Sequence, residues 1–325
     1  TLNGKVGTLG QVSSVVDFGL SGISMDDPEV MQAIGRDATG SFKLEFIEGE
    51  PLKLSEVDVS GSGLTLTGDA LISGLSGGFE TVFTTRLKAN DISRFSGLAG
   101  RDLDGSIDIA LEGTANLGGE FELQAAGIAR DLAVSQAQID DLLLGQTELT
   151  LNAVRDTSGT RVKTLSLRND QWDLRASGAL SNARADLNFK TTLNETSGFA
   201  DILDGPATLA GTAKQRNGEW SVDVNATGPF ATTAHVNGVV TGPNARVSYN
   251  ANIPNIAPIS PNLKGAAALN GNVISSREGW ILETEVNGPY DLVISASGKI
   301  TGTAAPDVSL TARLPDISPL VPKIN

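Results

Sequence analysis

Apolar and polar residues alternate along most of the chain, so that apolar side chains occupy every second position. In the segment 107–112, Ile, Ile and Leu alternate with Asp, Ala and Glu. The same period of two runs through 280–286 and 308–314. Because successive side chains of a strand point to opposite faces of a sheet, this period predicts β-strands with one apolar face and one polar face.

Turn residues separate the alternating segments. Gly228-Pro229, Gly242-Pro243 and Gly288-Pro289 pair a residue that tolerates positive φ with one whose φ is fixed, which is typical of turns. Helical patterns are scarce. One short helix is predicted near 28–34, after the capping residue Asp27, and a weaker helical pattern covers 135–144. The chain is therefore predicted to be almost wholly β.

The C-terminal half of the sequence matches itself after a shift of about sixty residues. Trp220 falls on Trp280, and Gly228-Pro229-Phe230 falls on Gly288-Pro289-Tyr290. Proline-rich segments recur as well, since Ile253-Pro254 corresponds to Leu314-Pro315 one residue out of register. A shift of the same length places Gly145 on Gly205. The match weakens toward the N-terminus. The prediction is an elongated array of repeats, in which units stack along one axis without one large globular core.

The predicted organisation is a row of β repeats with five parts. They are degenerate repeats with one short helix near 28–34 in residues 1–104, a shortened repeat over 105–144, and full repeats over 145–204, 205–264 and 265–325. Neither predicted helix recurs at the repeat period, so helices do not cover the apolar face of every strand. The sheet must then curl onto itself, pair with a second sheet, or bury this face against a ligand.

Composition excludes several classes of function. The 325 residues carry 38 acidic and 24 basic side chains, a net charge of −14. Nucleic acid is excluded as a partner, because binding depends on Lys and Arg that neutralise phosphates. The absence of cysteine excludes disulfides and Cys-ligated zinc. No apolar stretch is long enough for a transmembrane helix, no signal peptide is visible, and the chain is interpreted as a segment of a longer protein.

Candidate catalytic residues are few and have simpler explanations. The single histidine, His235, lies in a strand-like segment with no serine–acid arrangement nearby. The acidic pairs Asp26-Asp27, Asp140-Asp141 and Asp102/Asp104 are expected to be turn and cap residues rather than the two acids of a glycosidase. Nucleotide-binding loops and calcium-binding motifs are absent from the sequence. We therefore predict a non-enzymatic protein with no catalytic residues, cofactor or metal.

Several short phrases together resemble the AsmA-like superfamily, and most closely the TamB-like large subunit of the bacterial translocation and assembly module. The resemblance extends from about residue 40 to the end of the chain. The family's N-terminal membrane anchor and C-terminal region have no counterpart in this sequence, so the resemblance implies an interior segment. The phrases are Leu111-Glu112-Gly113-Thr114-Ala115, Ala176-Ser177-Gly178-Ala179-Leu180, Leu209-Ala210-Gly211-Thr212-Ala213, Ile253-Pro254-Asn255-Ile256-Ala257-Pro258 and Leu314-Pro315-Asp316-Ile317-Ser318-Pro319-Leu320.

The resemblance implies a curled β-sheet half-pipe, β-taco-like, with an apolar groove. It also implies a periplasmic segment of a protein anchored in the inner membrane of a Gram-negative bacterium. Such a protein moves phospholipid between the inner and outer membranes, or assists outer-membrane protein assembly with a barrel partner of the TamA type. The expected ligands are phospholipid acyl chains.

The alternation selects candidate residues for the lipid groove, although a register slip of one residue would exchange the two faces. The candidates are Val222, Val224, Leu282, Val286, Leu292, Ile294, Val308 and Leu310. The alternative function is a secreted or surface β-solenoid that acts as an adhesin or carbohydrate-binding scaffold. Trp220 and Trp280 would then be candidates for sugar stacking, but their equivalent places in the repeat favour packing between units.

Overall fold

The computed structural model describes residues 2–6, 10–135, 137–181, 184–196, 204–261, 263–301 and 307–315, and for 2–6 and 137–139 it describes the backbone alone. The chain divides into two compact units, Thr1–Ser177 and Gly178–Asn325. The division falls inside β11 (Trp172–Ser181), within the predicted repeat 145–204. The compact units therefore do not coincide with the repeats.

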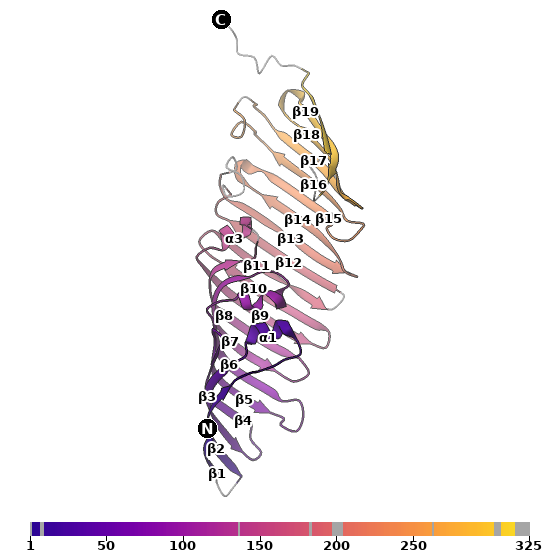
Figure 1. Ribbon diagram of the computed structural model, residues 1–325. Coiled ribbons are helices and arrows are strands. Elements are labelled where there is room, and N and C mark those ends of the chain that lie inside the picture. The colour runs from indigo at the N-terminus through magenta and orange to yellow at the C-terminus, as the bar shows by residue number, and fades with distance from the viewer. Residues whose placement is uncertain are drawn as a thin grey trace. The chain divides into compact units, whose positions relative to one another are not determined.

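The first unit is an antiparallel meander in which each strand from β1 to β9 pairs with the strand that follows it. Figure 1 shows these strands side by side in chain order, from indigo to magenta. The strands are β1 (Leu2–Val6), β2 (Gln11–Leu20), β3 (Ala38–Ile47), β4 (Leu52–Gly61), β5 (Leu64–Ser73), β6 (Glu80–Ala89), β7 (Asp104–Ala115), β8 (Phe121–Ala133), β9 (Gln146–Asp156) and β10 (Gly159–Arg168).

The second unit continues with the same topology, and consecutive strands from β12 to β20 pair antiparallel. Its strands are β12 (Arg184–Leu193), β13 (Ala207–Arg216), β14 (Glu219–Thr227), β15 (Thr233–Val239), β16 (Arg246–Ile253), β17 (Ala267–Ser276), β18 (Gly279–Asn287), β19 (Val293–Ile300) and β20 (Asp307–Arg313). Each predicted full repeat thus corresponds to four strands, and the shortened one to two.

The predicted fold class is confirmed. The chain is all-β and antiparallel with a few short helices, and among the described residues no ladder joins the first strand of a unit to its last. An open sheet of this kind is consistent with a curled half-pipe. The helices and 3-10 turns are α1 (Pro28–Ile34), η1 (Ser93–Phe95), α2 (Ser96–Ala99), α3 (Ala137–Leu143), η2 (Pro229–Ala231) and η3 (Pro289–Asp291).

The strands of the first unit are joined either by long connections that carry helices or by tight turns. Since strand direction reverses at every step, the helix-bearing connections after β2, β6 and β8 all lie on the same side of the sheet, where these strands end. We call each of the two sides formed by strand ends an edge. At the helix-bearing edge α1 packs against η1 and α2. At the opposite edge the described connections are tight turns, at 48–51, 74–79, 116–120 and 157–158, whereas the helix-bearing edge also has tight turns at 62–63 and 169–171. The two edges of the sheet therefore offer different surfaces.

Helix α1 lies at the predicted residues because the sequence caps it. The Asp27 carboxylate accepts hydrogen bonds from the backbone N–H groups of Glu29, at 2.8 Å, and Val30, at 3.3 Å. Pro28 begins the helix, where its missing N–H leaves no hydrogen bond unmade. The weaker helical pattern of the sequence appears as α3, whereas η1 and α2 were not predicted.

Glycines mark equivalent positions at the starts of the predicted repeats. The carbonyl groups of Gly105, Gly145 and Gly265 accept hydrogen bonds of 2.8–2.9 Å from Ile92, Asp131 and Ile256. At Gly205 the donor is the hydroxyl group of Thr196, at 2.9 Å. In each case the glycine lies where a long connection ends and an odd-numbered strand begins.

Glycines also allow neighbouring strands to approach closely on the apolar face. A Cβ atom added to Gly113 of β7 would overlap the Glu122 carbonyl group of β8 and lie 3.1 Å from the Leu123 Cα atom. Gly211 of β13 has the same relation to Asp223 and Val224 of β14. Glycines inside strands commonly mark tight bends, so we attribute bending of the sheet to these positions.

The interior of the protein is thin. Eight of the twelve buried hydrophobic residues among those described are alanine, and no Phe, Val or Met is among the twelve. The accessible surface is 19,906 Å². Two compact globular proteins with the same total mass of 33.6 kDa would together expose roughly 15,000 Å². The large exposed area indicates a single layer of sheet rather than a filled core.

We predict that Gly113→Ala destabilises the first unit by about 1–3 kcal/mol, because its Cβ atom would displace backbone of the next strand. Gly77→Ala is the matched control, since no atom lies within 4 Å of a Cβ added there. Urea unfolding would measure both variants. Equal unfolding free energies for the two would contradict the proposed role of the close approach.

Candidate functional site

The apolar face of the second unit is built from three rows of residues that lie side by side across β12 to β20. The strands are about 4.8 Å apart, so neighbours within a row are in contact distance. The rows are Leu187, Ala213, Val222, Gly238, Val247, Val273, Leu282, Gly298 and Val308; Phe189, Gly211, Val224, Val236, Tyr249, Gly271, Thr284, Ala296 and Leu310; and Thr191, Leu209, Ala226, Ala234, Ala251, Leu269, Val286, Ile294 and Ala312.

No residue of these rows is charged, and most of their large side chains are half-buried. The Tyr249 ring covers the vacant Cβ position of Gly271 on the neighbouring strand. At the last described strand the same face is more open, with Val308 exposed by 39% and Leu310 by 69%. The result is a continuous uncharged surface that is partly accessible along its length.

Seven of the eight predicted groove residues lie together on this face. Val222, Leu282 and Val308 share the first row, Val224 and Leu310 the second, and Val286 and Ile294 the third. The eighth, Leu292, lies between η3 and β19 rather than in a strand, and its N–H donates to the Pro289 carbonyl group at 3.2 Å. The structure therefore brings the strand residues together and leaves Leu292 in a turn.

The first unit has an equivalent apolar face that the predicted groove residues did not include. The alternation in 107–112 is a signal for it, since Ile107, Ile109 and Leu111 lie on this face in β7. One of its rows runs from β3 to β10. Its members are Leu44, Leu54, Ala70, Phe83, Gly113, Leu123, Ala153 and Val162.

The opposite face of the first unit carries ion pairs. The Arg86 guanidinium donates to both carboxylate oxygens of Asp108, with Nε–Oδ1 and Nη2–Oδ2 distances of 2.5 and 2.9 Å. Lys88 adds an Nζ–Oδ2 distance of 3.3 Å to the same carboxylate. The hydrogen bonds from Arg86 hold the pKa of Asp108 below its usual value. This face is suited to water, whereas the apolar face is not.

The corresponding face of the second unit is polar and rich in asparagine. His235 lies there, with Nδ1 at 3.0 Å from the Asn225 Oδ1 atom and 3.7 Å from the Asp223 Oδ1 atom. The same row continues through Asn250 and Asn270. These described contacts join His235 to an amide and a carboxylate.

Three of the six acidic residues named from the sequence serve local structure. Asp27 caps α1, Asp104 accepts from the Gly105 N–H at 2.6 Å, and Asp140 accepts from the Val134 N–H at 2.7 Å. Sequence reasoning missed one pair, Glu195 and Asp204, which a long connection brings together. A hydrogen bond with Asp204 raises the pKa of Glu195. The two residues are not neighbours in the sequence, so no local pattern indicated that they are in contact.

Nowhere in the part of the chain that the structure describes do three His, Cys, Asp or Glu side chains gather as potential metal ligands. None of the helices there has the length and apolar character needed to cross a membrane.

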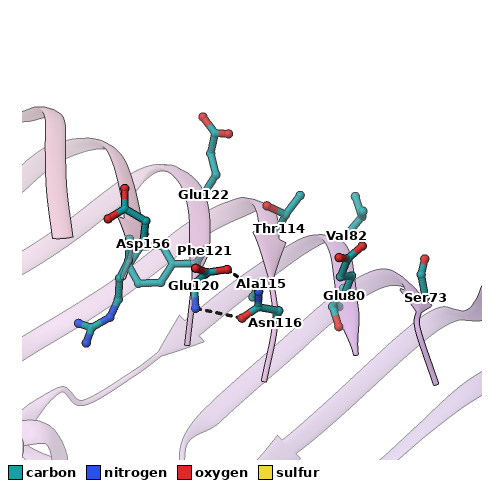
Figure 2. A pocket seen from close by; sticks show the side chains of 12 residues that line it. Ser73, Glu80, Val82, Thr114, Ala115, Asn116, Glu120, Phe121, Glu122 and Asp156 are labelled. Atoms are coloured by element: carbon teal, nitrogen blue, oxygen red, sulfur yellow. Dashed lines mark hydrogen bonds between the residues drawn. The ribbon is translucent and has the colours of Figure 1, made fainter. Parts of the chain in front are cut away.

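A cavity of about 450 Å³ lies at the tight-turn edge of the first unit. Figure 2 shows its lining side chains at the ends of adjacent strands. Phe121 and Ala115 reach it from the apolar face, whereas Glu80, Glu120, Glu122 and Asp156 supply four carboxylates and Arg155 supplies one guanidinium group. The cavity therefore joins the apolar face to an acidic rim.

We predict that Asp108→Asn lowers the free energy of unfolding at pH 7 by no more than about 1 kcal/mol, because the ion pair is screened by solvent. The folded-state pKa of Asp108 is lowered, so its contribution is complete above the unfolded pKa of about 3.9 and is lost as pH falls through the folded value. Urea unfolding of both proteins from pH 7 to pH 2 would measure this. A difference that stays constant across this range would contradict the prediction.

Comparison with known proteins gave no match: neither a protein family, a curated protein nor a solved structure is significantly similar to this chain.

Proposed function

We propose that the chain is a non-catalytic conduit for phospholipid, in which the apolar face of the sheet holds acyl chains. The observation that carries the proposal is the uncharged three-row face, whose large side chains are half-buried rather than enclosed in a core. Each methylene group removed from water contributes about 0.8 kcal/mol, so a sixteen-carbon chain gains on the order of 10 kcal/mol at full burial. Affinity of this kind needs no specific polar residue.

The polar face supports the same function. In the first unit, ion pairs such as Arg86–Asp108 keep one side of the sheet in water. The opposite side remains available to a ligand. A sheet with these two faces can shield acyl chains from an aqueous compartment, as transport between two membranes requires.

We assign the chain to the periplasm, as part of a protein anchored in the inner membrane of a Gram-negative bacterium. The phrases shared with TamB-like proteins support this assignment. A role in outer-membrane protein assembly with a barrel partner of the TamA type belongs to the same proposal. An unfolded outer-membrane strand also presents an alternating apolar face, which the same surface would accommodate.

The first prediction of this proposal is that phospholipid co-purifies with the protein from a bacterial envelope. Native mass spectrometry with lipid extraction would detect it. A measured mass equal to that of the protein without lipid after gentle purification, together with no uptake of a fluorescent fatty acid, would contradict a lipid-binding face.

The second prediction compares two neighbouring positions on β18. Leu282 lies in the first row of the apolar face, whereas Ile281 points to the opposite face and is exposed by 41%. Leu282→Glu places a charge against acyl chains, so we expect it to weaken binding of a fluorescent fatty acid at least tenfold. Ile281→Glu, which introduces the same charge on the polar face, should bind as the unmodified protein does.

Circular dichroism and thermal unfolding would establish that both variants remain folded. Equal binding by two folded variants would exclude the apolar face as the ligand site.

A further inference from the structure

Two adjacent tight turns of the first unit expose large apolar side chains. The turn 74–79 carries Leu75 and Phe79, which are exposed by 40% and 39%, and the turn 116–120 carries Leu117, which is exposed by 76%. Among the described large hydrophobic residues, Leu117 has the highest exposed fraction. Tight turns usually carry small and polar residues, so these three side chains call for an explanation.

A backbone hydrogen bond joins the two turns. The Leu117 N–H donates to the Gly78 carbonyl group at 2.9 Å, which fastens the second turn to the first. Next to this bond, Phe79 adopts a positive φ of 47°, a conformation that is unfavourable for a bulky side chain. Its N–H donates to the Gly77 carbonyl group at 2.8 Å. The backbone thus holds Phe79 and Leu117 on neighbouring tips.

Hydrogen bonds brace the Leu117 turn from within. Asn116 Oδ1 accepts from the Glu120 N–H at 3.1 Å, and Asn116 Nδ2 donates to Glu120 Oε2 at 2.9 Å. Figure 2 shows both contacts at the cavity. The Asn116 N–H also donates to the Glu120 carbonyl group at 3.0 Å. A braced turn presents its apolar side chain without ordering a flexible loop on binding.

The other tight turns of this edge do not share the feature. The turn 48–51 reads Glu-Gly-Glu-Pro, and the turn 157–158 reads Thr-Ser. Among the described tight turns of this edge, those at 74–79 and 116–120 are therefore the ones that expose large apolar side chains.

The charges around these turns select among possible partners. Neither segment 74–80 nor segment 116–122 contains Lys or Arg. The cavity behind the tips is lined by four carboxylates, of Glu80, Glu120, Glu122 and Asp156, and by one cation, of Arg155. An anionic surface would be repelled. A surface of zwitterionic phospholipid offers ammonium groups to the carboxylates and an apolar layer to the tips.

The size of the patch disfavours a stable protein interface. Such an interface buries about 800 Å² on each partner, whereas three side chains of at most about 250 Å² each, all partly buried already, supply much less. Insertion into lipid has no minimum area, because each apolar side chain contributes by itself.

We infer that the turns 74–79 and 116–120 form a membrane-contacting tip that inserts Leu75, Phe79 and Leu117 into the interface of a zwitterionic bilayer. The tip brings the tight-turn edge of the first unit to the membrane and places the acidic cavity at headgroup level. This inference goes beyond the conduit function and does not depend on it.

Flotation with vesicles of phosphatidylcholine and phosphatidylethanolamine tests the inference. The unmodified protein should float with the vesicles, and Leu117→Asp should lower its partition coefficient at least tenfold. Leu144→Asp is the matched control, since Leu144 is exposed by 57% in the helix-bearing connection before β9. It should float as the unmodified protein does.

Two readouts separate this inference from the proposed function. Leu117→Asp should retain binding of the fluorescent fatty acid, because Leu117 lies outside the apolar rows, and Leu282→Glu should still float. Failure of the unmodified protein to float, equal losses for Leu117→Asp and Leu144→Asp, or stronger flotation with anionic vesicles would each overturn the inference.

Discussion

The close approach of neighbouring strands at glycines on the apolar face is the constraint on which the rest of the structure depends. At Gly113 and Gly211 the backbone of the next strand occupies the space of a side chain. Large residues flank these glycines in the same rows, as Phe83 and Leu123 flank Gly113. At Gly113 a position without a side chain therefore lies between two large side chains of the neighbouring strands. This arrangement lets a single layer of sheet bend over its own apolar face.

A single layer leaves its apolar face incompletely covered. Buried positions are mostly taken by alanine, whereas the large aliphatic side chains of the rows remain half-buried. In a closed sandwich these side chains would be packed against a second sheet. Here their remaining exposure supplies the driving force that the proposed function requires.

The two edges of the first unit differ because strand direction reverses at every turn. The described helices of this unit gather at one edge, where tight turns also occur, whereas the described connections at the other edge are all tight turns. A helix-bearing connection needs capping residues such as Asp27, whereas a tight turn needs glycine at positive φ, as at Gly78 and Gly119. The braced turns at 74–79 and 116–120 place apolar tips on the second edge. The proposed membrane contact thus follows from the topology as much as from the residues themselves.

The sequence by itself determined the strands, the all-β class and the shared face of seven groove candidates, because the period of two is a local property of each strand. It also located α1 through the local capping by Asp27. The tertiary structure alone decided what depends on neighbouring strands: the apolar face of the first unit as a continuous row, the Glu195–Asp204 pair, and the bond that joins Leu117 to Gly78. Leu292 shows the limit of prediction from alternation. The alternating pattern extends over this residue, whereas the strand begins only at Val293. Pairing register and turn geometry arise from contacts between segments, and a local pattern does not contain them.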